Sequence, residues 1–199
     1  KTVAWLRGYL GYEPHMQTGD KLFLFDDARN FNFSQVPKEF DWILWIDTDD
    51  VIKNGQNLRK VVDMASEKQF EAVYFNYLYH VELDNKTYCE ACHQQVAPNL
   101  RQIKHVIIEH LRERLVRNNG KYKWIAPIHE TLIEQVPTNK TDNYDVEIVH
   151  LATYEDRLNS LTRNMKLLEL AVARSEGKDP RHLYYLAKAY FDRRTTEYD

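Results

Sequence analysis

The sequence predicts an α/β fold in which helices flank a sheet. Segments typical of strands alternate along the chain with segments typical of amphipathic helices, and this interleaving indicates that class. The run "DWILWID" (41–47) is almost continuously apolar, which is typical of a strand covered on both faces in a parallel sheet. Soon after it, "QNLRKVVDMASEKQF" (56–70) places its apolar residues on one face of a helix: Leu58, Val61, Val62 and Ala65.

The spacing of apolar residues predicts the other elements. Val3, Leu6 and Leu10 have helical spacing, and "DDARNFNFSQV" (26–36) indicates a short helix with Asp26 or Asp27 as its N-cap. β-Branched and aromatic runs predict strands at 21–25, 71–83, the second half of 105–118, 123–136 and 144–154. The polar segment 84–104 is expected to form a long loop.

The character of the chain changes near residue 156. The segment 156–177 has apolar residues at helical spacing, and a second helix is expected to begin with Asp179 as N-cap and Pro180 at its first position. Two helices joined by "EGKDP" form a helical hairpin. The sequence therefore divides into an α/β part, 1–155, and a helical part, 156–199.

Composition limits the classes of function. A formal charge of -3 and a pI of about 6.3 give the chain no overall attraction to nucleic acid or anionic membranes. No apolar stretch approaches the roughly 20 residues that span a bilayer, so no membrane span and a cytoplasmic location are expected. Cys89 and Cys92, in "CEACH", fit a haem attachment site, part of a zinc site, or a loop with two free thiols.

The acidic cluster after the apolar run is the first candidate for chemistry. If the strand stays extended through Ile46, the side chains of Asp47 and Asp49 point to one side. Two carboxylates at the carboxyl end of a strand suit Mg²⁺ or Mn²⁺. The alternative is a solvated turn whose aspartates cap the next helix, and capping is the role expected of Asp50.

Several motifs resemble one enzyme family. "DDARNFNFSQVPKEFDWILWIDTDD" resembles the nucleotide-sugar segment of family 2 glycosyltransferases with the GT-A fold, in which an "aRN" helix, an apolar strand and a D-x-D motif follow one another. "RERLVRN", "KWIAPIHETL" and "VEIVHL" resemble later segments of the bacterial and viral branch, whose catalytic domain precedes tetratricopeptide-like helices. The resemblance covers residues 22 to 193 and implies that the chain opens after the first strand of the family's catalytic domain.

The resemblance implies a nucleotide-sugar site. Asp49 would coordinate a divalent cation, Mn²⁺ or Mg²⁺, that bridges the diphosphate of a donor, with a UDP-sugar preferred. Asp47 would contact the ribose or the metal, and His150 would complete the metal site. Arg29 would lie near the diphosphate or the base. A histidine buried in the core and an arginine on a helix surface remain the alternatives for His150 and Arg29.

Glu130 is the preferred general base, because an inverting transfer needs a carboxylate to remove the proton of the acceptor hydroxyl. In an extended segment His129 and Glu130 face opposite ways, so His129 is the competing candidate. Arg112 and Arg114 share one side of a strand, where either could hold phosphate or acceptor. Trp124 either stacks on a sugar or, in the preferred interpretation, lies in the core.

Three functions are consistent with these residues. The first is a metal-dependent, inverting glycosyltransferase acting on an acceptor that the sequence does not identify, whether glycan, lipid-linked sugar, peptide or protein. The second is a non-catalytic module that binds a nucleotide or, through its C-terminal helices, a protein. The third, a two-metal phosphotransferase or nuclease, lacks the additional carboxylates that such a site requires.

Overall fold

A computed structural model describes residues 13–14, 21–81, 88–89, 94–95, 105–152 and 154–197. The predicted helix near residues 2–11, most of the predicted loop 84–104, and Cys92 lie outside these residues. Within them the chain is mixed α/β, with strands and four α-helices, so the predicted fold class is confirmed at that level.

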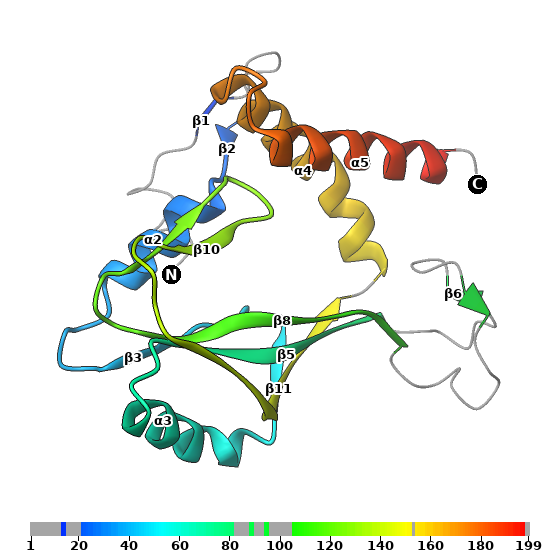
Figure 1. Cartoon of the computed structure of the whole chain (residues 1–199). Helices are drawn as coiled ribbons and strands as arrows, with labels where there is room; N and C mark the ends of the chain where they lie inside the picture. Colours follow the sequence, from blue (N-terminus) through cyan, green and yellow to red (C-terminus); the bar gives the residue numbers. More distant parts are fainter. Residues whose placement is uncertain are drawn as a thin grey trace. The chain divides into compact units, whose positions relative to one another are not determined.

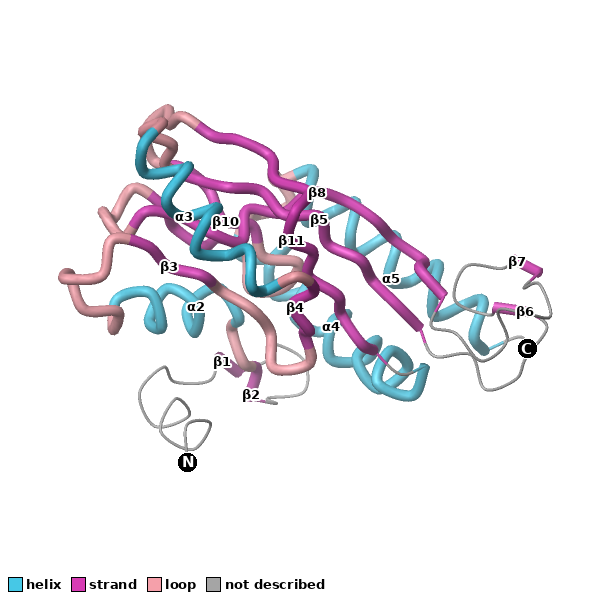
Figure 2. The backbone as a smooth tube through the Cα atoms, turned by 90° about the horizontal axis from the view of Figure 1, so that it is seen from below, coloured by secondary structure: helices cyan, strands magenta, loops and turns pink. Residues whose placement is uncertain are grey.

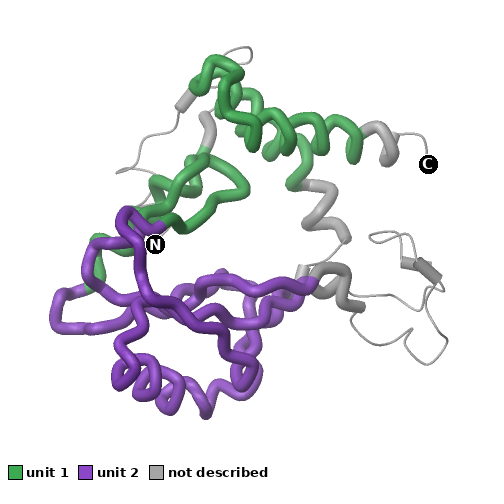
Figure 3. The backbone as a smooth tube through the Cα atoms, in the orientation of Figure 1, with its two compact units in different colours: residues 1–36, 123–133, 158–199 green, residues 37–122, 134–157 purple. Residues whose placement is uncertain are grey.

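The chain divides into two compact units (Figure 3). One comprises residues 37–122 and 134–157, and the other comprises 1–36, 123–133 and 158–199. For brevity they are called the sheet unit and the helical unit. The predicted helical part therefore belongs to the same unit as two earlier segments of the chain.

The sheet unit is built on a five-stranded mixed sheet in the order β3-β8-β5-β11-β4 (Figure 1). Its strands are β3 (Trp42–Leu44), β4 (Asp50–Lys53), β5 (Ala72–Val81), β8 (His105–Arg117) and β11 (Lys140–Ala152). Strands β5 and β11 are parallel, and the other neighbours are antiparallel. A strand was predicted only for the second half of 105–118, and β8 extends over almost the whole segment.

Helix α3 (Leu58–Glu67) covers one face of this sheet, following the short 3₁₀ helix η1 (Gly55–Asn57). Seen from below in Figure 2, α3 lies over the strands. Its buried residues Val61 and Ala65 pack against Phe75, Leu115 and Ile148 of the sheet, as the apolar spacing predicts. Helix α3 therefore covers this face of the sheet.

The strand before the acidic cluster is shorter than predicted. Strand β3 ends at Leu44, pairs antiparallel with β8, and is at the edge of the sheet formed by the described strands. The expectation of an extended strand through Ile46, covered on both faces in a parallel sheet, is therefore wrong. Ile43 and Trp45 are buried, whereas Ile46 is exposed, so the apolar run is only partly a strand signal.

Strand β8 contains a β-bulge at Arg114. Val73 of β5 pairs with Leu115, and Tyr74 pairs with Glu113, so Arg114 has no opposing residue in β5. A bulge bends its strand and re-aims the side chain of the extra residue. Here the extra residue is a fully buried arginine.

The helical unit contains α2 (Phe25–Ser34), most of α4 (Tyr154–Arg174) and α5 (Pro180–Glu197). It also contains residues 123–133, which include most of strands β9 (Tyr122–Ile125) and β10 (Thr131–Glu134). Its core contains residues from all three of its segments: Leu24, Ile128, Met165, Leu167, Leu168, Leu170 and Ala189. The predicted single strand 123–136 is instead two strands joined by a turn, in which Ala126 and His129 have positive φ.

The ends of these helices follow from capping residues. Asp179 Oδ1 accepts the backbone N–H of Arg181 at 2.8 Å, so Asp179 caps α5 as predicted. Gly177, after α4, has φ of 69°, a conformation that glycine adopts without steric cost. The N-cap of α2 is Leu24, and Asp26 and Asp27 lie inside its first turn, so that capping prediction is wrong.

Two short strand pairs complete the described backbone: β1 (Glu13–Pro14) with β2 (Lys21–Leu22), and β6 (Tyr88–Cys89) with β7 (Gln94–Gln95). Across the described ranges, every helix is too short or too polar to cross a bilayer.

Asn30 provides a test of how the helical unit is held together. Its side-chain amide donates to the Trp124 carbonyl at 2.9 Å and accepts the Trp124 N–H at 2.9 Å, which joins α2 to β9. Replacing Asn30 by Ala removes both hydrogen bonds, and we expect the free energy of unfolding in urea to fall by about 1 to 3 kcal/mol. Asn32→Ala, on an exposed position of the same helix, is the control; equal effects of the two variants would contradict this account.

Candidate metal centre

The four residues Asp47 to Asp50 form a tight turn between β3 and β4. The Asp50 N–H donates to the Asp47 carbonyl at 3.0 Å, and the Asp47 N–H donates to Asp50 Oδ2 at 2.9 Å. The turn breaks the alternation that was expected to place Asp47 beside Asp49. It instead brings the side chains of Asp49 and Asp50 toward the same partner, His150.

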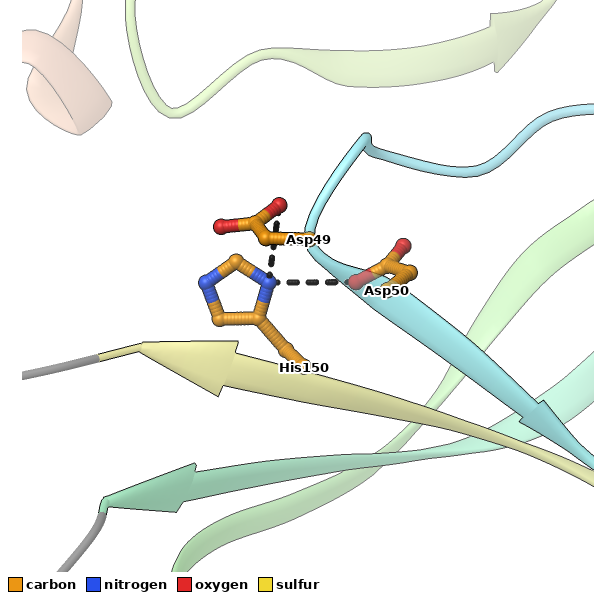
Figure 4. Close-up of side chains that lie close together, drawn as sticks. All are labelled: Asp49, Asp50 and His150. Atoms are coloured by element: carbon orange, nitrogen blue, oxygen red, sulfur yellow. Dashed lines mark hydrogen bonds and ion pairs between the residues drawn. The ribbon is translucent and has the colours of Figure 1, made fainter.

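His150 reaches this turn from β11. It is the register partner of Asp50 in the antiparallel β4–β11 pair. Its Nδ1 lies 3.1 Å from Asp50 Oδ1 and 3.6 Å from Asp49 Oδ1 (Figure 4). Two carboxylates and one imidazole that are separated by 100 residues in sequence thus meet at one point of the sheet.

The side chain of Asp50 is 0% exposed, and it lies beside an equally buried Arg114. Arg114 Nη1 is 3.1 Å from Asp50 Oδ2 and 3.9 Å from Asp47 Oδ2. The sequence suggested that Asp50 caps a helix, and that prediction is wrong. Its two oxygens contact different partners, His150 on one side and Arg114 with the Asp47 N–H on the other.

The guanidinium of Arg114 is enclosed by aromatic rings. Its Cζ lies 3.9 Å from the centroid of the Trp45 ring and 4.3 Å from that of Tyr77. Its three side-chain nitrogens have no hydrogen bond of acceptable geometry among the described residues. The buried cation is therefore stabilised by the Asp50 charge and by the electron-rich ring faces.

The close charges alter the acidities of the group. Burial alone would raise the pKa of Asp50, but hydrogen bonds from His150 and the Asp47 N–H, with the Arg114 charge, hold it below its usual value. Burial alone would lower the pKa of His150, but its hydrogen bond to Asp50 and the charges of the three nearby aspartates raise it. In the metal-free protein Asp50 is an anion and His150 binds its proton more tightly than usual.

Tyrosines limit the movement of the imidazole. The Tyr79 ring centroid is 4.6 Å from that of His150, and Tyr77 is 6.0 Å away. Burial, together with the Asp50 charge, raises the pKa of Tyr77, so this residue is a neutral phenol. The His150 ring therefore lies between tyrosines and the two carboxylates.

The donor set fits a divalent cation. Carboxylate oxygens and a neutral imidazole suit Mn²⁺, and oxygen donors alone suit Mg²⁺. Asp49 is 50% exposed, whereas Asp50 is buried and already bonded, so Asp49 and His150 are the residues best able to take a ligand from solvent. Asp47 lies at the same turn, but its described carboxylate contact is with Arg114.

Arg112 lies on the same side of β8 as Arg114, as the sequence predicted, because both guanidinium groups contact the Trp45 ring. Arg112 is only partly buried. Of the two arginines it is therefore the one accessible to a ligand.

The helical unit holds the remaining predicted site residues. Arg29 Nε donates to Glu130 Oε1 at 2.6 Å, and its guanidinium lies 4.9 Å from the Trp124 ring centroid. Glu130 is 12% exposed, and Trp124 is buried, as preferred from the sequence. His129 stacks on Tyr185 at 4.4 Å, and burial lowers its pKa despite the Glu130 charge.

Comparison with known proteins does not add a family. No family model matches the chain, and no curated protein matches its sequence at a significant level. The assignment to family 2 glycosyltransferases therefore rests on the motifs quoted above and stays a prediction.

Sequence reasoning missed the roles of Asp50 and of the rings that enclose Arg114. Asp50 was expected to be a cap, because its actual partners are a histidine 100 positions later and the charge of a buried arginine, and neither is visible in the local sequence. The sequence did contain one signal for a further role of Asp50, which is the presence of a third aspartate. A pair of metal ligands accounts for two of the three carboxylates, and helix α3 has no side-chain cap that would account for the third. Tyr77 and Tyr79 gave no signal beyond strand propensity.

The pKa of His150 should exceed that of His110 in protein kept free of metal. Burial and the nearby Arg112 and Arg114 lower the pKa of His110, whereas Asp50 and Asp49 raise that of His150 against burial. NMR titration of the two rings measures both values. The stability that His150 contributes is complete below its unfolded pKa of about 6.5 and is lost as the pH rises through its raised folded value. A His150 pKa at or below that of His110 would contradict the described electrostatics.

Proposed function

We propose that this protein is a metal-dependent glycosyltransferase of family 2 with the GT-A fold. It transfers a sugar from a nucleoside diphosphate sugar, preferably a UDP-sugar, to an acceptor with inversion. The observation that carries the proposal is the meeting of Asp49 with His150, which the motif order predicts and which the sheet register brings within 3.6 Å. The mixed α/β sheet supports the fold without distinguishing GT-A from other α/β folds.

Asp49 and His150 would hold Mn²⁺ or Mg²⁺, with Asp47 nearby. The cation, when bound, would neutralise the negative charge of the departing diphosphate. Arg112, half-buried beside Trp45, is suited to bind phosphate oxygens through its planar donor fork. Asp47 and Asp49 restrict the site to a ligand that arrives with a cation, since bare phosphate would be repelled by carboxylates.

Glu130 would act on the acceptor. As general base it accepts the proton of the acceptor hydroxyl while that oxygen attacks the sugar carbon from the face opposite the leaving group. Its hydrogen bond from Arg29 Nε orients the carboxylate. The acceptor class stays open between glycan, lipid-linked sugar, peptide and protein.

A second candidate is a binding module without catalysis. The 2.6 Å bond between Arg29 and Glu130 favours it, because that bond already occupies one oxygen of the carboxylate that a general base would offer to the acceptor. Helix α5 also exposes apolar side chains that suit a protein partner: Leu183, Tyr184, Tyr190 and Phe191. Calorimetry separates the two candidates, since UDP binding that does not depend on Mn²⁺ favours the module.

Asp49→Asn should remove most of the metal-dependent turnover of a UDP-sugar. A bound metal supplies several kcal/mol of charge stabilisation, so a loss of about a thousandfold is expected. Hydrolysis or transfer assayed with Mn²⁺ measures the loss. Asp63→Asn removes the same charge from an exposed position of α3 and should leave turnover unchanged. Wild-type turnover in the Asp49 variant would exclude the metal assignment.

Glu130→Gln should lower kcat by about a hundred- to ten-thousandfold, the usual contribution of a general base. UDP affinity should stay within about twofold of wild type, because Glu130 is not assigned to the donor. Glu67→Gln, exposed at the end of α3, is the matched control. If Glu130→Gln turns over normally, the base is another residue, with His129 as the next candidate.

A further inference from the structure

We propose that Asp50 and Arg114 are positioning residues that orient His150 for the cation. Arg114 holds the Asp50 carboxylate, Asp50 accepts the Nδ1 proton of His150, and Nε2 then keeps the lone pair that a cation would bind. The inference rests on the proposed metal role of His150 and Asp49. It assigns Arg114, expected from the sequence to touch phosphate or acceptor, to a different task.

The first step concerns the burial of Arg114. Its side chain is 0% exposed, and its guanidinium contacts the rings of Trp45 and Tyr77. Arg114 is therefore not accessible to a nucleotide from solvent. The β-bulge in β8 aims it inward, and the Asp50 carboxylate is the nearest described anion, at 3.1 Å.

The second step concerns the two oxygens of Asp50. Oδ2 accepts the Asp47 N–H at 2.9 Å and faces Arg114, so it is fixed from two directions. Oδ1 lies 3.1 Å from His150 Nδ1, which fits a donated imidazole N–H. Both carboxylate oxygens of Asp50 already have partners and its side chain is not exposed. Asp50 therefore orients the His150 ring rather than binding a cation from solvent.

The third step concerns the ring itself. When Nδ1 carries the proton, Nε2 of a neutral imidazole has the lone pair that binds a metal. In Figure 4 this second ring nitrogen points away from Asp50. Nδ1 already lies 3.1 Å from Asp50 Oδ1, so a cation bound at Nδ1 would have to displace that hydrogen bond. A carboxylate that accepts the other N–H of a ligating histidine fixes the tautomer and raises ligand basicity.

The test uses the full chain and two readouts that do not depend on turnover. The first is the tautomer of His150, read from the ¹⁵N shifts of its ring in metal-free protein at a pH above its pKa. Wild-type protein should carry the proton on Nδ1. Asp50→Asn should shift the proton toward Nε2, whereas Asp49→Asn should leave it on Nδ1. The ring of His110 is the internal control for folding in each variant.

The second readout is Mn²⁺ affinity, measured by electron paramagnetic resonance. Asp50→Asn should bind Mn²⁺ about 10- to 100-fold more weakly, the usual loss when the partner of a ligating histidine is removed. Arg114→Lys keeps a positive charge beside Asp50, so its Mn²⁺ affinity should stay closer to that of wild-type protein than the affinity of Arg114→Met. If Arg114→Met does not fold, Asp50→Asn and Arg114→Lys still test the proposal.

The outcomes separate this inference from the proposed function. A wild-type proton on Nε2, or a tautomer and Mn²⁺ affinity unaffected by Asp50→Asn, overturns the positioning role even if Asp49 proves essential for metal and turnover. A proton on Nδ1 that depends on Asp50, in a chain that binds neither Mn²⁺ nor Mg²⁺, shows that Asp50 sets the tautomer but overturns both the metal-dependent enzyme and the assignment of that tautomer to cation binding.

Discussion

The buried pair of Arg114 and Asp50 is the constraint on which the rest of the sheet unit depends. An uncompensated charge inside a protein is costly, and removing one member of a buried ion pair typically costs about 3 to 5 kcal/mol. The surroundings of the pair meet this demand. The β-bulge lies at Arg114, the rings of Trp45 and Tyr77 contact its guanidinium, and the turn donates the Asp47 N–H to Asp50.

This constraint explains why the turn between β3 and β4 has its present form. An extended strand through Asp49 would place Asp50 on the opposite side from Asp49. The turn, closed by the Asp50 N–H on the Asp47 carbonyl, directs both carboxylates to His150 while keeping one of them on Arg114. One aspartate is thereby reserved for structure and its neighbour remains accessible to a ligand.

Local sequence patterns predicted the elements that local physics decides. The amphipathic face of α3, the strand 72–81, and the Asp179 cap followed by Pro180 all depend on residues within a few positions of one another. The bulge at Arg114 and the turn 126–129 depend on pairing across the sheet or on packing against α4, and the sequence predicted neither.

The residues of the candidate site also divide into those that the sequence predicted and those whose roles depend on tertiary contacts. Asp49 and His150 were predicted as partners because the resemblance to GT-A glycosyltransferases implies that both hold the metal. Asp50 was not, because its role depends on a cross-strand register and on a buried cation. Arg29 and Glu130 were each predicted for a separate task, yet they bond to each other. Pairing between distant residues is set by tertiary contacts, which periodicity in one segment does not record.

The order of the strands in the sheet has a consequence for how the protein matures on the ribosome. Among the described strands, the single neighbour of β4 is β11, which lies between β4 and β5. Strand β4 therefore cannot join this sheet until the last strand has been synthesised, 100 residues after Asp50. At usual rates of translation this delay is about 5 to 20 s. During that interval the aspartates of the turn have no His150 partner, so the cluster of Asp49, Asp50 and His150 assembles only after the whole sheet has been made.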